Sequence, residues 1–167
     1  MSHAVFIGLG SNLSDPIQQV TQSIKELGTL KNCTLIRASS LYETPPMGPQ
    51  DQPNYVNAVV EIETELSPQA LLLTLQTLEN QHARTRDTGK WEARTLDLDI
   101  LHYEGVQSTD ATLTLPHSGL HKRNFVLYPL LEISPHLNIP NLGKIAQLIE
   151  QLNEPIPTIV QPKSLDK

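Results

Sequence analysis

The chain has 167 residues, a formal net charge of -6 and a single cysteine. This length is typical of one domain with its own apolar core, and one cysteine excludes an internal disulfide and disfavours a thiolate zinc site. The acidic balance argues against non-specific binding to nucleic acid. The N-terminal apolar run is too short for a membrane span and lacks the basic flank of a signal peptide, so we expect a cytoplasmic protein.

The first expected elements are a buried strand and an amphipathic helix. Residues 4–9 form an apolar run that ends in turn residues, as a short buried strand does. Asp15 and Pro16 then provide a helix start, and Gly28 provides a stop after apolar residues at helical spacing. The stretch GLGSN (residues 8–12) lacks the third glycine of a dinucleotide fingerprint, so we do not assign that function to it.

Two further strands are expected at residues 34–42 and 55–64. Alternate apolar residues of the later strand share one face, which leaves Tyr55 and Asn57 on the other. The segment between the strands, ETPPMGPQDQPN, holds four prolines, which restrict its backbone. It either only connects the strands or presents fixed backbone groups to a flat heterocycle, with Tyr55 as a stacking surface and Asn57 as a two-point amide contact.

Ser67 and Pro68 are expected to start a second helix that runs to about Ala83, with leucines along its buried stripe. Gln76 and Glu79 fall on the flank of this helix, where we expect them to be exposed. The helix leads into a short basic loop, and the loop joins a strand at residues 95–103.

The chemistry is expected where this basic loop meets the strand. Asp97 and Asp99 alternate with leucines, so both carboxylates point to the same face, roughly 6.6 Å apart along the strand. Mg²⁺ usually takes one or two carboxylates and completes its shell with water and substrate phosphates. The loop supplies the cations that bind polyphosphate, namely Arg84, Arg86, Lys90 and Arg94. The pattern indicates a nucleotide and metal site; the alternative is a solvated strand face in which Arg94 simply pairs with the aspartates.

The order strand, helix, strand, strand, helix, strand predicts an α+β fold of the ferredoxin-like type, with both helices on one face of an antiparallel sheet. The other face would then hold Asn57, Asp97 and Asp99 together. The C-terminal additions expected beyond this core are an edge hairpin at 107–115, an apolar helix near 126–133 and a last helix near 144–152. We assign residues 1–152 to a single domain and residues 153–167 to a tail whose order the sequence leaves undefined.

Four segments resemble the 6-hydroxymethyl-7,8-dihydropterin pyrophosphokinases of folate biosynthesis: GLGSNL, SSLYETPPMGPQDQPNYVNAVVEIET, KWEARTLDLDIL and LPHSGLHKRNFVLYPL. The resemblance covers roughly residues 4 to 140. It implies transfer of diphosphate from ATP to the hydroxymethyl group of the dihydropterin, with release of AMP and participation of two Mg²⁺ ions. We expect a monomer whose partners are these small molecules, with neither nucleic acid nor membrane as a partner.

The resemblance also implies roles for individual side chains. Asp97 and Asp99 would bind the metal ions, and Arg84 and Arg94 would complete the catalytic group by clamping the phosphates. The loop that carries Trp91 would close over ATP as a lid. The implied ATP-binding residues are Gln76, Glu79, Arg84, Arg86, Trp91, Arg94, Ile100, Thr114, His117 and Arg123. The implied pterin-binding residues are Thr44, Pro45, Met47, Tyr55, Asn57, Trp91, Asp97 and Phe125.

The chain departs from the family pattern at a few positions. Some members have an aromatic residue at the position of Ser118 and basic residues at those of Thr112 and His121.

Two other functions are compatible with paired aspartates or a sheet surface. A palm-type nucleotidyl transferase also sets paired aspartates on such a sheet, but it would need a positive groove. An RNA-binding sheet would need aromatic and basic residues on its central strands, where this chain has carboxylates.

Overall fold

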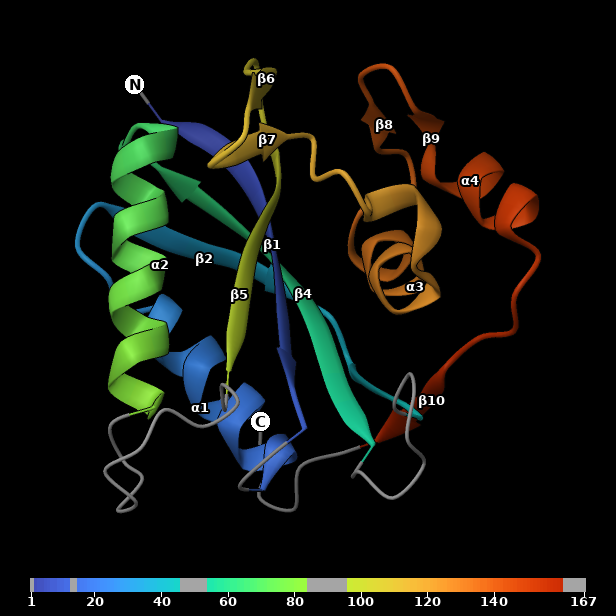
Figure 1. Cartoon of the computed structure of the whole chain (residues 1–167), viewed down its shortest axis with the longest axis horizontal. Coiled ribbons are helices and arrows are strands. Elements are labelled where there is room, and N and C mark those ends of the chain that lie inside the picture. The colour runs from blue at the N-terminus through green and yellow to red at the C-terminus, as the bar shows by residue number, and fades with distance from the viewer. Residues whose placement is uncertain (1, 13–14, 46–53, 84–95, 161–167) are drawn as a thin grey trace.

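The computed structural model describes residues 2–12, 15–45, 54–83 and 96–160. Within these residues the centre of the fold is a six-stranded antiparallel sheet in the order β10-β3-β4-β1-β5, with β2 also paired to β4 (Figure 1). The strands are β1 (His3–Ser11), β2 (Cys33–Ala38), β3 (Leu41–Thr44), β4 (Tyr55–Thr64), β5 (Asp97–Tyr103) and β10 (Thr158–Val160). The expected α+β fold is confirmed.

Helices lie on both faces of the sheet (Figure 1). On one face α1 (Pro16–Leu27) and α2 (Pro68–Ala83) cover a core that includes Ile7 of β1. On the other, α3 (Asn124–Ile133) and α4 (Ile145–Leu152) pack over Phe6 and Leu101. The second face is therefore only partly open, because apolar residues at one end of β1 and β5 continue into a second core. The open part is the opposite end, around Gly8 and Gly10 of β1.

Both helices of the first face begin at the residues that the sequence indicates. The Asp15 carboxylate accepts a hydrogen bond from the Gln18 backbone N–H at the start of α1. At the start of α2 the Ser67 hydroxyl accepts one from the Ala70 N–H at 3.1 Å. Each side chain satisfies a backbone donor that the first helical turn leaves unpaired.

The remaining elements are short and lie beyond the main sheet. The expected hairpin forms β6 (Ser108–Asp110) and β7 (Leu113–Leu115), and the turn η1 (Leu120–Lys122) leads into α3. A second small hairpin consists of β8 (Asn138–Ile139) and β9 (Gly143–Lys144). None of the helices in the described segments is both long and apolar enough to cross a membrane.

The strand expected at residues 34–42 is split into β2 and β3. Between them the Ser39 N–H donates to the Val59 carbonyl at 2.9 Å, while the Ser39 hydroxyl accepts from the Val59 N–H at 3.0 Å. A side chain thus replaces one backbone group of the ladder. Both halves pair with β4, so the expected strand exists but is interrupted.

The C-terminal segment contributes an edge strand that the sequence did not predict. Thr158–Val160 pairs antiparallel with β3. The Asn124 side-chain amide donates to the Pro155 carbonyl at 2.9 Å, which ties the segment to the start of α3. Because β10 is short and follows two prolines, its sequence shows little alternation, and its pairing with β3 depends on the tertiary fold.

A β-bulge in β5 places a histidine in the second core. The pairing with β1 shifts between Phe6 and Ile7, and His102 stacks on the Phe6 ring at 6.2 Å between centroids. His102 is 8% exposed, its Nδ1 has no hydrogen-bond partner among the described residues, and burial lowers its pKa. The folded protein therefore holds this imidazole neutral at a pH where the unfolded chain would protonate it.

We expect the free energy of unfolding to decrease as the pH falls from about 7.5 to about 5.5, because the unfolded state then binds more protons at His102 than the folded state does. Urea titrations of the wild type and His102→Phe, which keeps a ring beside Phe6, measure this effect. The variant should lose less stability on acidification. Equal losses would show that His102 does not contribute to the pH dependence.

Candidate active site

Strand pairing brings the predicted polar residues together at the open end of the second face. Gly10 of β1 lies opposite Asn57 of β4 on one side and Asp97 of β5 on the other. Gly8 lies opposite Asp99 in the same way. Since neighbouring strands are about 4.8 Å apart, Asn57 and Asp97 flank a space roughly 10 Å wide above β1.

The glycines of β1 keep this space clear. A Cβ atom on Gly10 would lie 2.7 Å from the Asn57 Nδ2 atom, and one on Gly8 would lie 3.3 Å from the Leu101 side chain. Real Cβ atoms essentially never show a contact as close as the first of these. The GLG stretch therefore provides room for side chains on the neighbouring strands, in agreement with our rejection of a dinucleotide fingerprint.

Asn57 presents a buried acceptor in this space. The residue is 9% exposed, and its Nδ2 donates to the Leu9 carbonyl at 3.5 Å. Its Oδ1 has no hydrogen-bond partner among the described residues. Leaving a buried amide oxygen unpaired costs free energy, so the arrangement suits a ligand that brings an N–H donor.

Tyr55 lies close to Asn57 in sequence and marks the outer end of β4. It is half-buried and pairs with Thr44 of β3. Pro45 follows Thr44 and is exposed. Tyr55, the buried Asn57 amide and the residues that flank the proline-rich segment thus lie at the same end of β3 and β4. A heterocycle site at this end stays a prediction.

Asp97 and Asp99 share the open face of β5. Asp97 is exposed and Asp99 is half-buried, whereas the intervening Leu98 is 4% exposed and belongs to the first core. No group of three or more histidine, cysteine, aspartate or glutamate side chains in the described segments could hold a metal ion. A carboxylate pair suits Mg²⁺ nevertheless, because substrate phosphates and water normally supply the remaining ligands.

Glu79 corrects one expectation, since it is buried rather than exposed on the helix flank. Its side chain is held against β5, where Oε2 accepts a hydrogen bond from the Leu98 N–H at 2.7 Å. β5 forms an edge of the sheet, so this N–H points away from β1. The carboxylate therefore fixes the backbone between the two aspartates. Gln76, one turn earlier, is exposed as expected.

We expect Glu79→Leu to lower the free energy of unfolding by about 1–3 kcal/mol, because it leaves the Leu98 N–H buried and unpaired. Glu79→Gln keeps an acceptor oxygen and should retain most of the stability. Urea denaturation of both variants measures the difference. If both variants lost the same stability, the hydrogen bond to Leu98 would not be the reason that Glu79 is buried.

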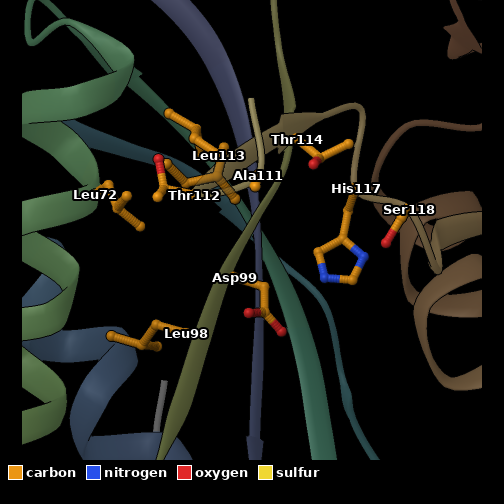
Figure 2. Close-up of a pocket in the computed structure, with 10 residues that line it drawn as sticks. Leu72, Leu98, Asp99, Ala111, Thr112, Leu113, Thr114, His117 and Ser118 are labelled. Atoms are coloured by element: carbon orange, nitrogen blue, oxygen red, sulfur yellow. The ribbon is translucent and has the colours of Figure 1, made fainter. Parts of the chain in front are cut away.

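A cavity of about 220 Å³ lies at the outer edge of β5, between α2, the β6–β7 hairpin and the residues that follow it (Figure 2). Its wall combines apolar side chains, hydroxyl groups and one carboxylate of the pair, that of Asp99. It is lined by Leu72, Leu98, Asp99, Ile100, Ala111, Thr112, Leu113, Thr114, His117 and Ser118. Three residues predicted to bind ATP, Ile100, Thr114 and His117, therefore line one cavity beside Asp99.

His117 lies beside Asp99 at the mouth of this cavity (Figure 2). Its Nδ1 accepts a hydrogen bond from the Gly119 N–H at 3.0 Å, which places the proton of the neutral ring on Nε2. Burial lowers the pKa of His117, the Asp99 carboxylate opposes that shift, and the nearby Arg123 charge reinforces it. The ring is thus a neutral hydrogen-bond donor near pH 7.

Arg123 and Phe125 lie at the start of α3. The Arg123 guanidinium sits over the Phe125 ring, 5.9 Å from its centroid, and Phe125 is half-buried against the second core. The predicted residues Arg84, Arg86, Trp91, Arg94 and Met47 lie outside the described residues. The roles of the basic loop and of its ion pairing with the aspartates therefore stay predictions.

These features define an α+β domain with two neighbouring binding spaces on one sheet. The carboxylate pair lies between them, with the cavity at the β5 edge on one side and the buried amide of Asn57 on the other. A sequence model of the family described as 7,8-dihydro-6-hydroxymethylpterin-pyrophosphokinase (HPPK) matches residues 6–135. The chain therefore belongs to the HPPK family, and the resemblance seen in the sequence is confirmed.

Individual relatives agree with this assignment. A Haemophilus influenzae protein named 2-amino-4-hydroxy-6-hydroxymethyldihydropteridine pyrophosphokinase is 48% identical over 146 residues, which cover 87% of this chain and 91% of that protein. A Pseudomonas aeruginosa protein of the same name is 40% identical over 150 residues, covering 89% of this chain and 91% of the relative.

Solved structures share the fold at much lower identity. The Plasmodium falciparum HPPK-DHPS with pteroate matches with a TM-score of 0.70 and 14% identity. The match covers 90% of this chain and 42% of that one, so this chain spans less than half of the Plasmodium protein. At this identity the likeness describes the fold alone.

Proposed function

We propose that this protein is an ATP-dependent pyrophosphokinase of folate biosynthesis. In the reaction the hydroxymethyl oxygen of 6-hydroxymethyl-7,8-dihydropterin attacks the β-phosphorus of ATP, the bond between that phosphorus and the α,β-bridging oxygen breaks, and AMP leaves. The hydroxyl proton passes to solvent water in the same transfer. The observation that carries the proposal is the position of Asp97 and Asp99 between the cavity at the β5 edge and the buried amide of Asn57.

ATP would place its base and ribose in the cavity at the β5 edge. Ile100 and Leu98 provide an apolar wall for a flat ring, and Thr114 provides a hydroxyl. The phosphates would then extend past His117 toward the carboxylate pair, with Arg123 close to His117. Gln76 and Glu79 complete the nucleotide side on α2, where Glu79 acts through the backbone of β5.

The dihydropterin would occupy the space beside Asn57. The unpaired Oδ1 of Asn57 would accept an N–H of the ring, and the Nδ2 group could donate to a ring acceptor. Tyr55 and Phe125 would stack on the two ring faces. Thr44 and Pro45 would contact the ring edge through their backbone. A bound ring would thus satisfy a polar atom that is otherwise left unpaired.

Two Mg²⁺ ions would be held by Asp97 and Asp99 together with phosphate oxygens. When bound, such ions neutralise charge on the transferring diphosphate. The protein's own part is to hold the two carboxylates at a fixed spacing, which the Glu79 hydrogen bond to the intervening Leu98 backbone supports. The Arg84 and Arg94 side chains would bind the phosphates from the loop.

We further propose that the protein acts as a cytoplasmic monomer on small-molecule substrates alone. Residues 1–152 would form the single catalytic domain, and the strand β10 beyond them would cover the outer edge of β3.

The test is the formation of AMP from ATP in the presence of Mg²⁺ and 6-hydroxymethyl-7,8-dihydropterin. AMP should form only when the pterin is present. The matched control is 6-methyl-7,8-dihydropterin, which keeps the ring but lacks the accepting hydroxyl and should give no AMP. Absence of AMP above the enzyme-free background with the hydroxymethyl substrate would reject the proposed function.

A further inference from the structure

The Arg123 side chain, which is exposed at the start of α3, lies close to both Gly119 and the Phe125 ring. An added Cβ atom on Gly119 would lie 3.0 Å from the Arg123 Nε, 3.1 Å from Cζ and 3.2 Å from Nη2. The near-equal distances mean that the guanidinium lies flat against this glycine. The guanidinium also lies over the Phe125 ring, whose centroid is 5.9 Å from Cζ.

Gly119 is not required by its backbone conformation. Its φ of -99° and ψ of 5° lie in the bridge region, which residues other than glycine also adopt. A side chain at this position would fit the main chain but would crowd the guanidinium. A Cβ atom at this position would therefore require the Arg123 guanidinium to move by a few tenths of an ångström.

We propose that Gly119 and Phe125 are positioning residues for Arg123, so that the ring assigned to the pterin site also serves nucleotide binding. The inference rests on the proposed function, in which Arg123 contacts ATP. Gly119 also donates its N–H to His117, so the same residue orients both side chains on the phosphate side. Phe125 packs against the second core, which makes it a firm support for the exposed Arg123 side chain.

The physical benefit is preorganisation. A free arginine loses rotamer freedom when it binds phosphate, and a side chain already in contact with Phe125 and Gly119 loses less. The contact between Arg123 and Phe125 is an exposed cation–π interaction. The strength expected for such an interaction corresponds to about a two- to fivefold change in the dissociation constant for the nucleotide.

The experiment measures the dissociation constant of a non-hydrolysable ATP analogue with Mg²⁺, by calorimetry and without any pterin. Gly119→Ala and Phe125→Leu should each weaken binding about two- to fivefold, and Arg123→Gln should weaken it at least as much. Gly28→Ala is the matched control, because that glycine has a φ of -70° and an added Cβ would meet nothing closer than 3.4 Å. It should bind the analogue as the wild type does.

Combined variants distinguish positioning from a general structural effect. In an Arg123→Gln background, Gly119→Ala and Phe125→Leu should cause little further loss, since no guanidinium remains to be held. Thermal unfolding of each variant checks that it is folded. Unchanged affinity in Phe125→Leu, or a loss that persists in full without Arg123, would overturn the inference. Failure of the wild type to bind the analogue would instead reject the proposed function, and the inference with it.

Discussion

Asp97→Ala should lower the turnover number by about a hundred- to a thousandfold or more while the protein stays folded. Asp97 is exposed at the start of β5, so removing its carboxylate should cost little stability. In the proposed reaction no other residue replaces the charge of Asp97 at the metal site. Electrostatic stabilisation by fixed groups is usually the largest single contribution to the rate enhancement in such sites. Steady-state kinetics with both substrates saturating measure the effect.

The control for this variant is Glu63→Ala, which removes an exposed carboxylate from the far end of β4. It should leave turnover unchanged. If Asp97→Ala retained turnover within about threefold of the wild type, a change well below the 1.4 kcal/mol that corresponds to a tenfold rate effect, the assignment of Asp97 to the metal site would be wrong.

Gly10→Ala should lower kcat/KM for the dihydropterin by about five- to a hundredfold, because the new Cβ would lie 2.7 Å from the Asn57 Nδ2 and displace the amide. Losing a hydrogen bond to a buried polar group corresponds to about 1–3 kcal/mol. The KM for ATP should change little, since the nucleotide cavity lies at the other edge of β5. Initial rates over a range of each substrate separate the two effects.

Asn57→Ala provides the comparison for Gly10→Ala. Both variants should show the same selective loss for the pterin, and the double variant should lose little more than either single one. If Gly10→Ala raised the KM values of both substrates equally, the added methyl group would be disturbing the sheet rather than the position of Asn57.

The sequence predicted the parts of the site that depend on local periodicity. Alternation along β4 and β5 placed Asn57, Asp97 and Asp99 on one face, and the structure brings them to the same end of the sheet. The helix starts at Asp15 and Ser67 were also readable, because a capping side chain and its backbone partner are close in sequence. These signals need no knowledge of tertiary contacts.

The missed features depend on contacts between segments that are distant in sequence. Glu79 fell on a polar helix flank, and only the packing of α2 against the edge strand reveals its hydrogen bond to Leu98. The pairing of β10 with β3 joins two segments that have more than a hundred residues between them. The close approach of Gly10 to Asn57 likewise follows from strand register, although the glycine-rich GLG stretch was a visible signal of close packing.

The predicted and observed structures differ most at the second face of the sheet. The ferredoxin-like order predicted an open surface opposite α1 and α2, yet α3 and α4 cover part of it. Phe6 and Leu101 form apolar contacts there, so the site is confined to the glycine end of β1. The apolar helices were predicted, but the sequence alone did not indicate which face they would cover.

The fate of the ATP phosphates tests the central claim most directly. ATP labelled at the β-phosphorus is incubated with the wild-type protein, Mg²⁺ and 6-hydroxymethyl-7,8-dihydropterin, and the products are separated. We expect the label on the pterin as a diphosphate ester, with one AMP formed for each ester. Label retained in ADP, with a single phosphate on the pterin, would contradict diphosphate transfer, and label released as free diphosphate without a pterin ester would contradict the pterin as acceptor.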